Sequence, residues 1–124
     1  MDAPDRPWTL CEAMNLSGKG RSQIEYWNTH LQKLLGCYDA NGMPFLFLIS
    51  YVDCATEKFD QIVSVYYEHL RFYSPGAYTL QSVEPLPMSS GWRDRNQYIR
   101  SAGCTYDREG FPTTVYHIFV RMGS

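Results

Sequence analysis

The chain has 124 residues, which suits a single domain, and we treat residues 1–124 as one domain with residues 1–7 as a flexible tail. Hydrophobic residues make up 44% and charged residues 19%, a composition that supports a buried core and argues against a wholly disordered chain. The formal net charge is -2, whereas proteins that bind mainly through phosphate contacts are usually basic, so nucleic-acid binding is not favoured.

The cysteines bear on the cellular compartment in which the protein is expected. Cys11, Cys37, Cys54 and Cys104 form no C-x-x-C pair, and the first residues do not resemble a signal peptide. We therefore expect a cytoplasmic protein with reduced thiols. No segment is long and apolar enough to cross a membrane. The histidines and cysteines have no metal-ligand spacing, so we expect no metal site and no cofactor.

Two capping boxes predict helices at the start of the chain. In such a box, a Ser or Thr and a Glu three residues later satisfy each other's backbone amides. Thr9 to Glu12 predicts a short helix with Leu10, Ala13 and Met14 facing inward. Ser22 to Glu25 predicts a second helix from about Gln23 to about Leu35. Its apolar residues recur at helical spacing: Ile24, Trp27, Leu31, Leu34 and Leu35.

We expect the rest of the chain to be organised around Pro44 to Asp53. Its apolar run from Phe45 to Ile49 does not alternate with polar residues, which is typical of a central strand covered on both faces. Asn41–Gly42 is a turn signal before this strand, and Tyr38 is predicted to begin a short strand that pairs back as a hairpin.

A third helix and three strands complete the prediction. The helix starts at Asp53 to Thr56 and ends at Ser74 to Gly76, with one apolar face formed by Phe59, Ile62, Val63, Tyr66, Leu70 and Tyr73. The strands are Tyr78 to Glu84, Gln97 to Tyr106 and Thr113 to Met122, with a turn at Asp107 to Gly110. Three successive strands favour an antiparallel meander, so the predicted fold class is α+β: N-terminal helices and a central helix on one face of a mostly antiparallel sheet.

The last strand has two distinct faces. Thr114, Tyr116, Ile118, Val120 and Met122 share one, and Val115, His117, Phe119 and Arg121 share the other.

The loop from Ser90 to Asn96 is our main candidate for a functional surface. Trp92, Arg93, Asp94 and Arg95 have the residue mix of interface hot spots, although Trp92 could instead fold back and cap the sheet. We therefore favour a small non-catalytic protein-interaction module, of the inhibitor, immunity or adaptor type, that binds a partner protein. The oligomeric state stays open.

A second function class follows from the order of elements. Helix, helix, hairpin, helix and strands resemble the NTF2-like superfamily in outline, a resemblance carried by element order alone. It implies a pocket between a curved sheet and the helices, for a small-molecule binder or an enzyme. His117, Tyr66 and Glu84 would line that pocket, and His117 with Arg121 and Glu84 could carry out acid–base work. The alternative places His117 and Arg121 on the solvent face of the sheet.

Three further patterns have both functional and structural interpretations. Residues 9–35 match a helix-turn-helix in outline and would then bind DNA, or they are two helices packed on the sheet. Lys19, Gly20 and Arg21 form a candidate anion site before a helix, or a solvated turn, and the P-loop order is absent. Cys54 precedes the third helix and could be a nucleophile with a lowered pKa, or a small buried residue.

Overall fold

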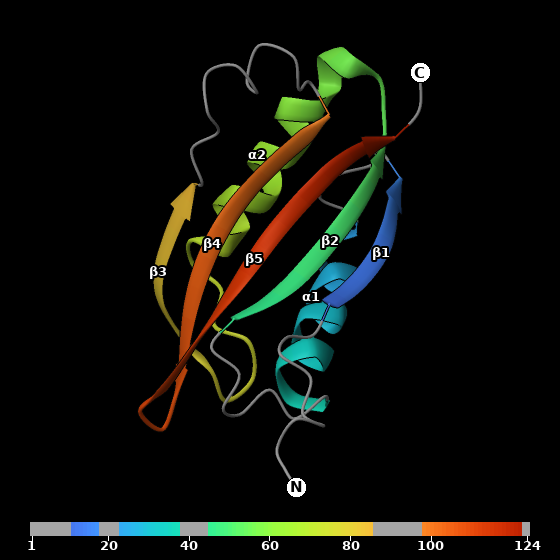
Figure 1. Cartoon of the computed structure of the whole chain (residues 1–124). Coiled ribbons are helices and arrows are strands. Elements are labelled where there is room, and N and C mark those ends of the chain that lie inside the picture. Colours follow the sequence, from blue (N-terminus) through green and yellow to red (C-terminus); the bar gives the residue numbers. More distant parts are fainter. Residues whose placement is uncertain (1–10, 18–22, 38–44, 86–97, 123–124) are drawn as a thin grey trace, which may run out of the picture.

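The computed structural model describes residues 11–17, 23–37, 45–85 and 98–122. They form a five-stranded sheet with two α-helices and a π-helical turn on one face, so the predicted α+β class is confirmed (Figure 1). The elements are β1 (Cys11–Ser17), α1 (Ile24–Gln32), η3 (Lys33–Cys37), β2 (Phe45–Asp53), α2 (Thr56–Leu70), β3 (Thr79–Pro85), β4 (Ile99–Arg108) and β5 (Phe111–Met122). The predicted tail at 1–7 and the predicted pairing of Tyr38 lie outside the described residues.

The sheet is mixed, with the strand order β1-β2-β5-β4-β3. The pairs β5–β4 and β4–β3 are antiparallel, which matches the predicted meander. The pairs β1–β2 and β2–β5 are parallel. Parallel neighbours need a crossover connection, and α1 lies in the connection between β1 and β2. The fully antiparallel arrangement is therefore confined to the half of the sheet built from the last three strands.

The predicted first helix is wrong, because residues 11–17 form the edge strand β1. Met14 and Leu16 are buried while Ala13 and Asn15 are exposed, which is the two-residue period of a strand. A capping box is a local signal, and a helix this short is marginal without strong packing. Pairing with β2, from Cys11 opposite Phe47 onward, satisfies the backbone instead. The predicted helix-turn-helix at 9–35 is therefore also wrong.

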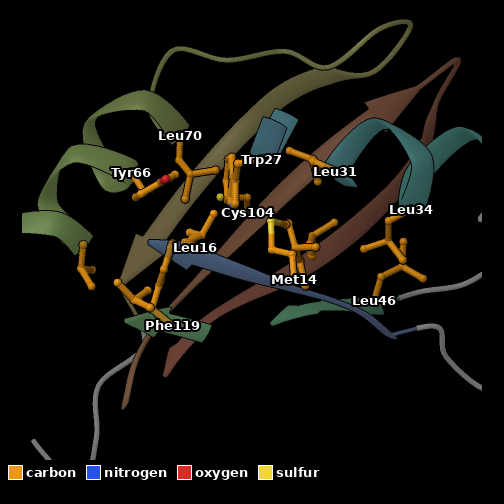
Figure 2. Packing of buried hydrophobic residues seen from close by; sticks show 14 of the residues in the cluster. Met14, Leu16, Trp27, Leu31, Leu34, Leu46, Tyr66, Leu70, Cys104 and Phe119 are labelled. Carbon is orange, nitrogen blue, oxygen red and sulfur yellow. The ribbon is translucent and has the colours of Figure 1, made fainter. Parts of the chain in front are cut away.

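Both remaining helices are confirmed, and they cover the same face of the sheet. Most of the periodic apolar positions identified in the sequence are buried: Trp27, Leu31, Leu34 and Leu35 of α1 and η3, and Phe59, Ile62, Val63, Tyr66 and Leu70 of α2. The other two, Ile24 and Tyr73, are only partly buried. The buried side chains pack with Met14, Leu16, Leu46, Leu48, Cys104 and Phe119 of the sheet. Trp27 lies in the middle of the labelled side chains in Figure 2. This core is the only cluster of buried apolar side chains that we identify in the described residues.

The predicted turn between the last two strands is confirmed. Glu109 and Gly110 both have positive φ, at 54° and 88°, as a two-residue type I′ turn requires. The Gly110 amide donates a hydrogen bond of 3.0 Å to the Asp107 carboxylate. The turn fixes the register of β4 against β5, and this register decides which side chains share a face.

The central strand β2 is confirmed at Phe45–Asp53, but its two faces differ. Leu46, Leu48, Ser50 and Val52 are buried under the helices. The side chains between them are only partly buried or exposed. The prediction that both faces are covered is therefore wrong for the described residues, because both helices lie on the same side of the sheet (Figure 1).

Candidate functional site

The face of the sheet opposite the helices carries a continuous set of apolar side chains, which we call the open face. Strand alternation and register define its members. The described helices and strands place no layer over it. Its apolar residues are Ala13 of β1, Phe45, Phe47, Ile49 and Tyr51 of β2, Tyr116, Ile118, Val120 and Met122 of β5, and Ile99 of β4.

Aromatic rings cluster at the centre of the open face. Phe47 stacks on its cross-strand neighbour Tyr116, with ring centroids 5.4 Å apart. Phe45 approaches both rings edge-on, at 6.2 Å from Phe47 and 6.4 Å from Tyr116. Phe45 is nevertheless 39% exposed, and Met122 at the far end of β5 is 48% exposed. These contacts leave the apolar cluster partly exposed to water, and contiguous exposed apolar surfaces mark interaction sites in folded proteins.

The apolar rows continue from this aromatic cluster along the strands. Ile49 lies opposite Ile118, and Tyr51 lies opposite Val120. On the far side of β5, Ile99 of β4 lies opposite Val120. Nine residues of β2 span about 30 Å, and five strands at about 4.8 Å spacing span about 20 Å, so this side of the sheet, with its polar side chains included, covers on the order of 600 Å². A standard protein–protein interface buries about 800 Å² on each partner, so the open face could supply most of one side.

Charge on the open face has one sign in the described part of the chain. Asp53 at the end of β2, Glu84 on the outer strand β3 and Asp107 beside the β4–β5 turn are all acidic and lie around the apolar centre. The described lysines and arginines lie elsewhere: Lys33, Lys58 and Arg71 on or just after helical elements, and Arg100, Arg108 and Arg121 on the helix side of β4 and β5. The open face is therefore apolar with an acidic rim.

The side chains predicted to line an NTF2-like pocket do not converge. His117 is fully buried between Trp27, whose ring centroid is 5.2 Å away, and Tyr106, whose hydroxyl is 3.3 Å from Nε2. Tyr66 lies on the same side, packed against Trp27. Glu84 lies on the opposite face of the sheet, since it pairs with Gly103 in the register of the open face. The predicted set of His117, Tyr66 and Glu84 is thus split across the sheet.

His117 and Arg121 are core groups, so both interpretations of them from the sequence are wrong. Burial, as the larger cause, and the neighbouring His69, as the smaller one, together lower the pKa of His117 to about 3, so the imidazole is neutral. The Arg121 guanidinium lies 4.6 Å from the Tyr98 ring centroid and donates a hydrogen bond to the Cys54 carbonyl at 3.3 Å. This hydrogen bond ties the end of β5 to the start of α2.

Cys54 does not have the environment of an activated nucleophile. It lies two residues before α2, as expected, but burial raises its pKa, with Arg121 as a smaller opposing influence. Of the two interpretations of Cys54, the nucleophile with a lowered pKa is therefore not supported, and the side chain is partly buried. Cys11, Cys54 and Cys104 are free thiols. The described residues contain no cluster of His, Cys, Asp and Glu that could hold a metal, and no described helix is long and apolar enough to cross a membrane.

Two predicted sites fall outside the described residues. These are the partner-binding residues Trp92, Arg93, Asp94 and Arg95 and the anion site at Lys19, Gly20 and Arg21, which stay predictions. The open face itself was missed. One signal for it was present, since β5 carries large apolar residues on both of its faces, such as Tyr116 and Ile118 on one and Phe119 on the other.

Comparison of the chain with protein-family models, with curated proteins and with solved structures gives no match.

Proposed function

We propose that this protein is a non-catalytic interaction module, of the inhibitor, immunity or adaptor type, that binds a partner protein through the open face of its sheet. The observation that carries the proposal is the partly exposed aromatic and aliphatic surface of β2 and β5, centred on the stacked Phe47 and Tyr116 rings. A solvated apolar surface of this size is unfavourable in water, and covering it with a partner removes that cost.

The acidic residues around the open face favour one class of partner over others. The acidic rim formed by Asp53, Glu84 and Asp107 favours a protein surface with an apolar centre and lysines or arginines around it. It disfavours nucleic acid, because phosphates would be repelled. It also disfavours a second copy of this chain stacked face to face, because the described residues of the open face offer no cation to pair with the rim. We therefore expect a heterologous protein partner.

The experiment compares variants on and off the open face. Tyr116→Ala and Ile118→Ala each remove part of the apolar centre, whereas Phe72→Ala removes a ring that is 79% exposed and follows α2 on the helix side. Partners captured by the wild-type protein are identified by mass spectrometry, expressed separately and titrated by calorimetry. Tyr116→Ala should weaken binding by about 2 kcal/mol, roughly a 30-fold loss of affinity, and Phe72→Ala should leave it unchanged.

Hydrogen exchange on the complex locates the contact directly. Amides of β2 and β5 should gain protection relative to the free protein, with little change in α2. Equal losses for Tyr116→Ala and Phe72→Ala, or protection confined to the helices, would contradict the proposal. A concentration-dependent dimer of the isolated protein that Tyr116→Ala dissociates would instead identify a second copy as the occupant.

A further inference from the structure

A second surface feature lies on the helix side of the sheet, away from the open face. It is a hollow of about 450 Å³ where the end of α1 and η3 meet the segment between α2 and β3 and the end of β4. Leu35, Pro75 and Tyr78 contribute apolar walls, and Gln32, Lys33 and Arg108 contribute polar groups. Natural small-molecule sites of about 300–1,000 Å³ share this mix of apolar walls and a few polar groups.

The charges at this hollow have one sign. Among the described residues that line it, Lys33 and Arg108 are the charged ones, and both are cations. The Arg108 guanidinium lies over the Tyr78 ring, 5.7 Å from its centroid, so an aromatic wall orients this cation. A guanidinium fork and an ammonium around one hollow suit the oxygens of a carboxylate or phosphate.

The walls of the hollow are fixed by specific interactions. The Tyr78 side chain is buried, and its hydroxyl donates a hydrogen bond of 2.8 Å to the Leu35 carbonyl within the π-helical turn η3. π-Helical turns are rare and occur frequently at functional sites. Gly76 has a φ of 56°, a conformation that strains other residues, and places the wall segment before Tyr78. The hollow is therefore built from ordered backbone with unusual local geometry.

We propose that this hollow binds a small organic anion, in which a carboxylate or phosphate group meets Lys33 and Arg108 and an apolar body lies against Leu35, Pro75 and Tyr78. This site is independent of the proposed protein interface, because its lining residues lie on the helix side of the sheet and those of the open face lie on the other. Either proposal can fail without the other.

The test uses four probes that separate the two halves of the ligand. Phenyl phosphate and benzoate carry both an anion and a ring, inorganic phosphate carries the anion alone, and benzyl alcohol carries the ring alone. Each is titrated into the full-length protein while backbone amide shifts are followed by NMR. Phenyl phosphate and benzoate should shift the amides of Thr29, Ala77 and Tyr78 in a saturable way, and the two half-probes should bind at least about tenfold more weakly.

Variants then assign the contacts. Lys33→Gln and Arg108→Gln should each weaken binding of phenyl phosphate at least about tenfold, since each removes a charge-assisted hydrogen bond. Lys58→Gln, which removes a cation from α2 away from the hollow, is the matched control and should bind like the wild type. The far-UV and near-UV circular dichroism of each variant checks that it is folded.

Three outcomes would overturn the proposal. The first is the absence of saturable shifts at the hollow. The second is an equal effect of Lys58→Gln, which would indicate non-specific attraction to cations. The third is equal binding of benzyl alcohol or inorganic phosphate, which would show that the hollow does not require an anion joined to an apolar body.

Discussion

Acid should destabilise this protein through His117. The imidazole is fully buried beside Trp27 and Tyr106, and burial, with a smaller effect of His69, lowers its pKa from 6.5 to about 3. In the unfolded chain the same group is hydrated and has a pKa of about 6.5. Below pH 6.5 the unfolded state therefore binds a proton that the folded state does not bind, and stability falls as the pH falls toward 3.

The size of the effect follows from the two pKa values. Between pH 7.5 and pH 5.0, His117 alone should cost about 2 kcal/mol of unfolding free energy. At pH 5.0 the buried imidazole is neutral in the folded protein, so the size of the loss is set mainly by the pKa of His117 in the unfolded state. Burial also lowers the pKa of His69, which adds to the loss in the same direction.

Urea denaturation at pH 7.5 and pH 5.0 measures this loss for the wild type and for His117→Leu. The substitution changes stability at both pH values, because it removes the contact with Tyr106 and repacks the core around Trp27. The comparison is therefore made within each protein between the two pH values. The wild type should lose about 2 kcal/mol more than His117→Leu. Equal losses in the two proteins would refute the assignment of His117 as a buried neutral group.

Three further predictions concern stability, thiols and the interaction loop. Leu48→Ala should cost about 2–5 kcal/mol in denaturant melts because Leu48 is fully buried, whereas Phe47→Ala on the open face should cost clearly less; equal costs would contradict the two-faced description of β2. Thiol titration of the unfolded protein without reductant should find all four cysteines free, and fewer than four free thiols would contradict the expectation that the cysteines are reduced. In the native state Cys104 should react slowly, because burial raises its pKa to about 11. Trp92→Ala should weaken partner binding by about 2 kcal/mol and leave the melting temperature unchanged, and a sharp drop in melting temperature would make Trp92 a cap on the sheet.

The type of the long periodic segments was predicted well from the sequence, because the spacing of their apolar residues indicates whether they form a helix or a strand. The 15 residues of α2 present one apolar face, so both the type and the buried side of this helix follow from periodicity, whereas the alternation of β5 over 12 residues predicts a strand but not which of its faces is buried. Segment 11–17 was not predicted, because its partner β2 is distant in the chain. Its capping box is compatible with the start of a helix, but the hydrogen bonds that the segment forms with β2 stabilise a strand instead.

The sequence did not indicate what covers the second face of β2. An apolar run such as Phe45 to Ile49 indicates that both sides of a strand avoid water, but it carries no information about which chain supplies the second cover. We assigned both covers to this chain, whereas the described helices supply one. The hollow near Lys33 was equally invisible, because its walls come from segments that are far apart in the sequence and none of them has a motif.

The sheet separates the two proposed activities physically. Side chains of β5 alternate between the core under the helices and the open face, so His117 and Ile118 are neighbours in sequence but lie on opposite sides. A partner on the open face would contact neither Lys33 nor Arg108, which lie on the helix side. Substitutions at separate sites with no shared contacts have additive effects on free energy. The double variant Tyr116→Ala/Arg108→Gln should therefore bind the partner as weakly as Tyr116→Ala alone and bind phenyl phosphate as weakly as Arg108→Gln alone. A further loss of either affinity in the double variant would show that one side of the sheet alters binding on the other.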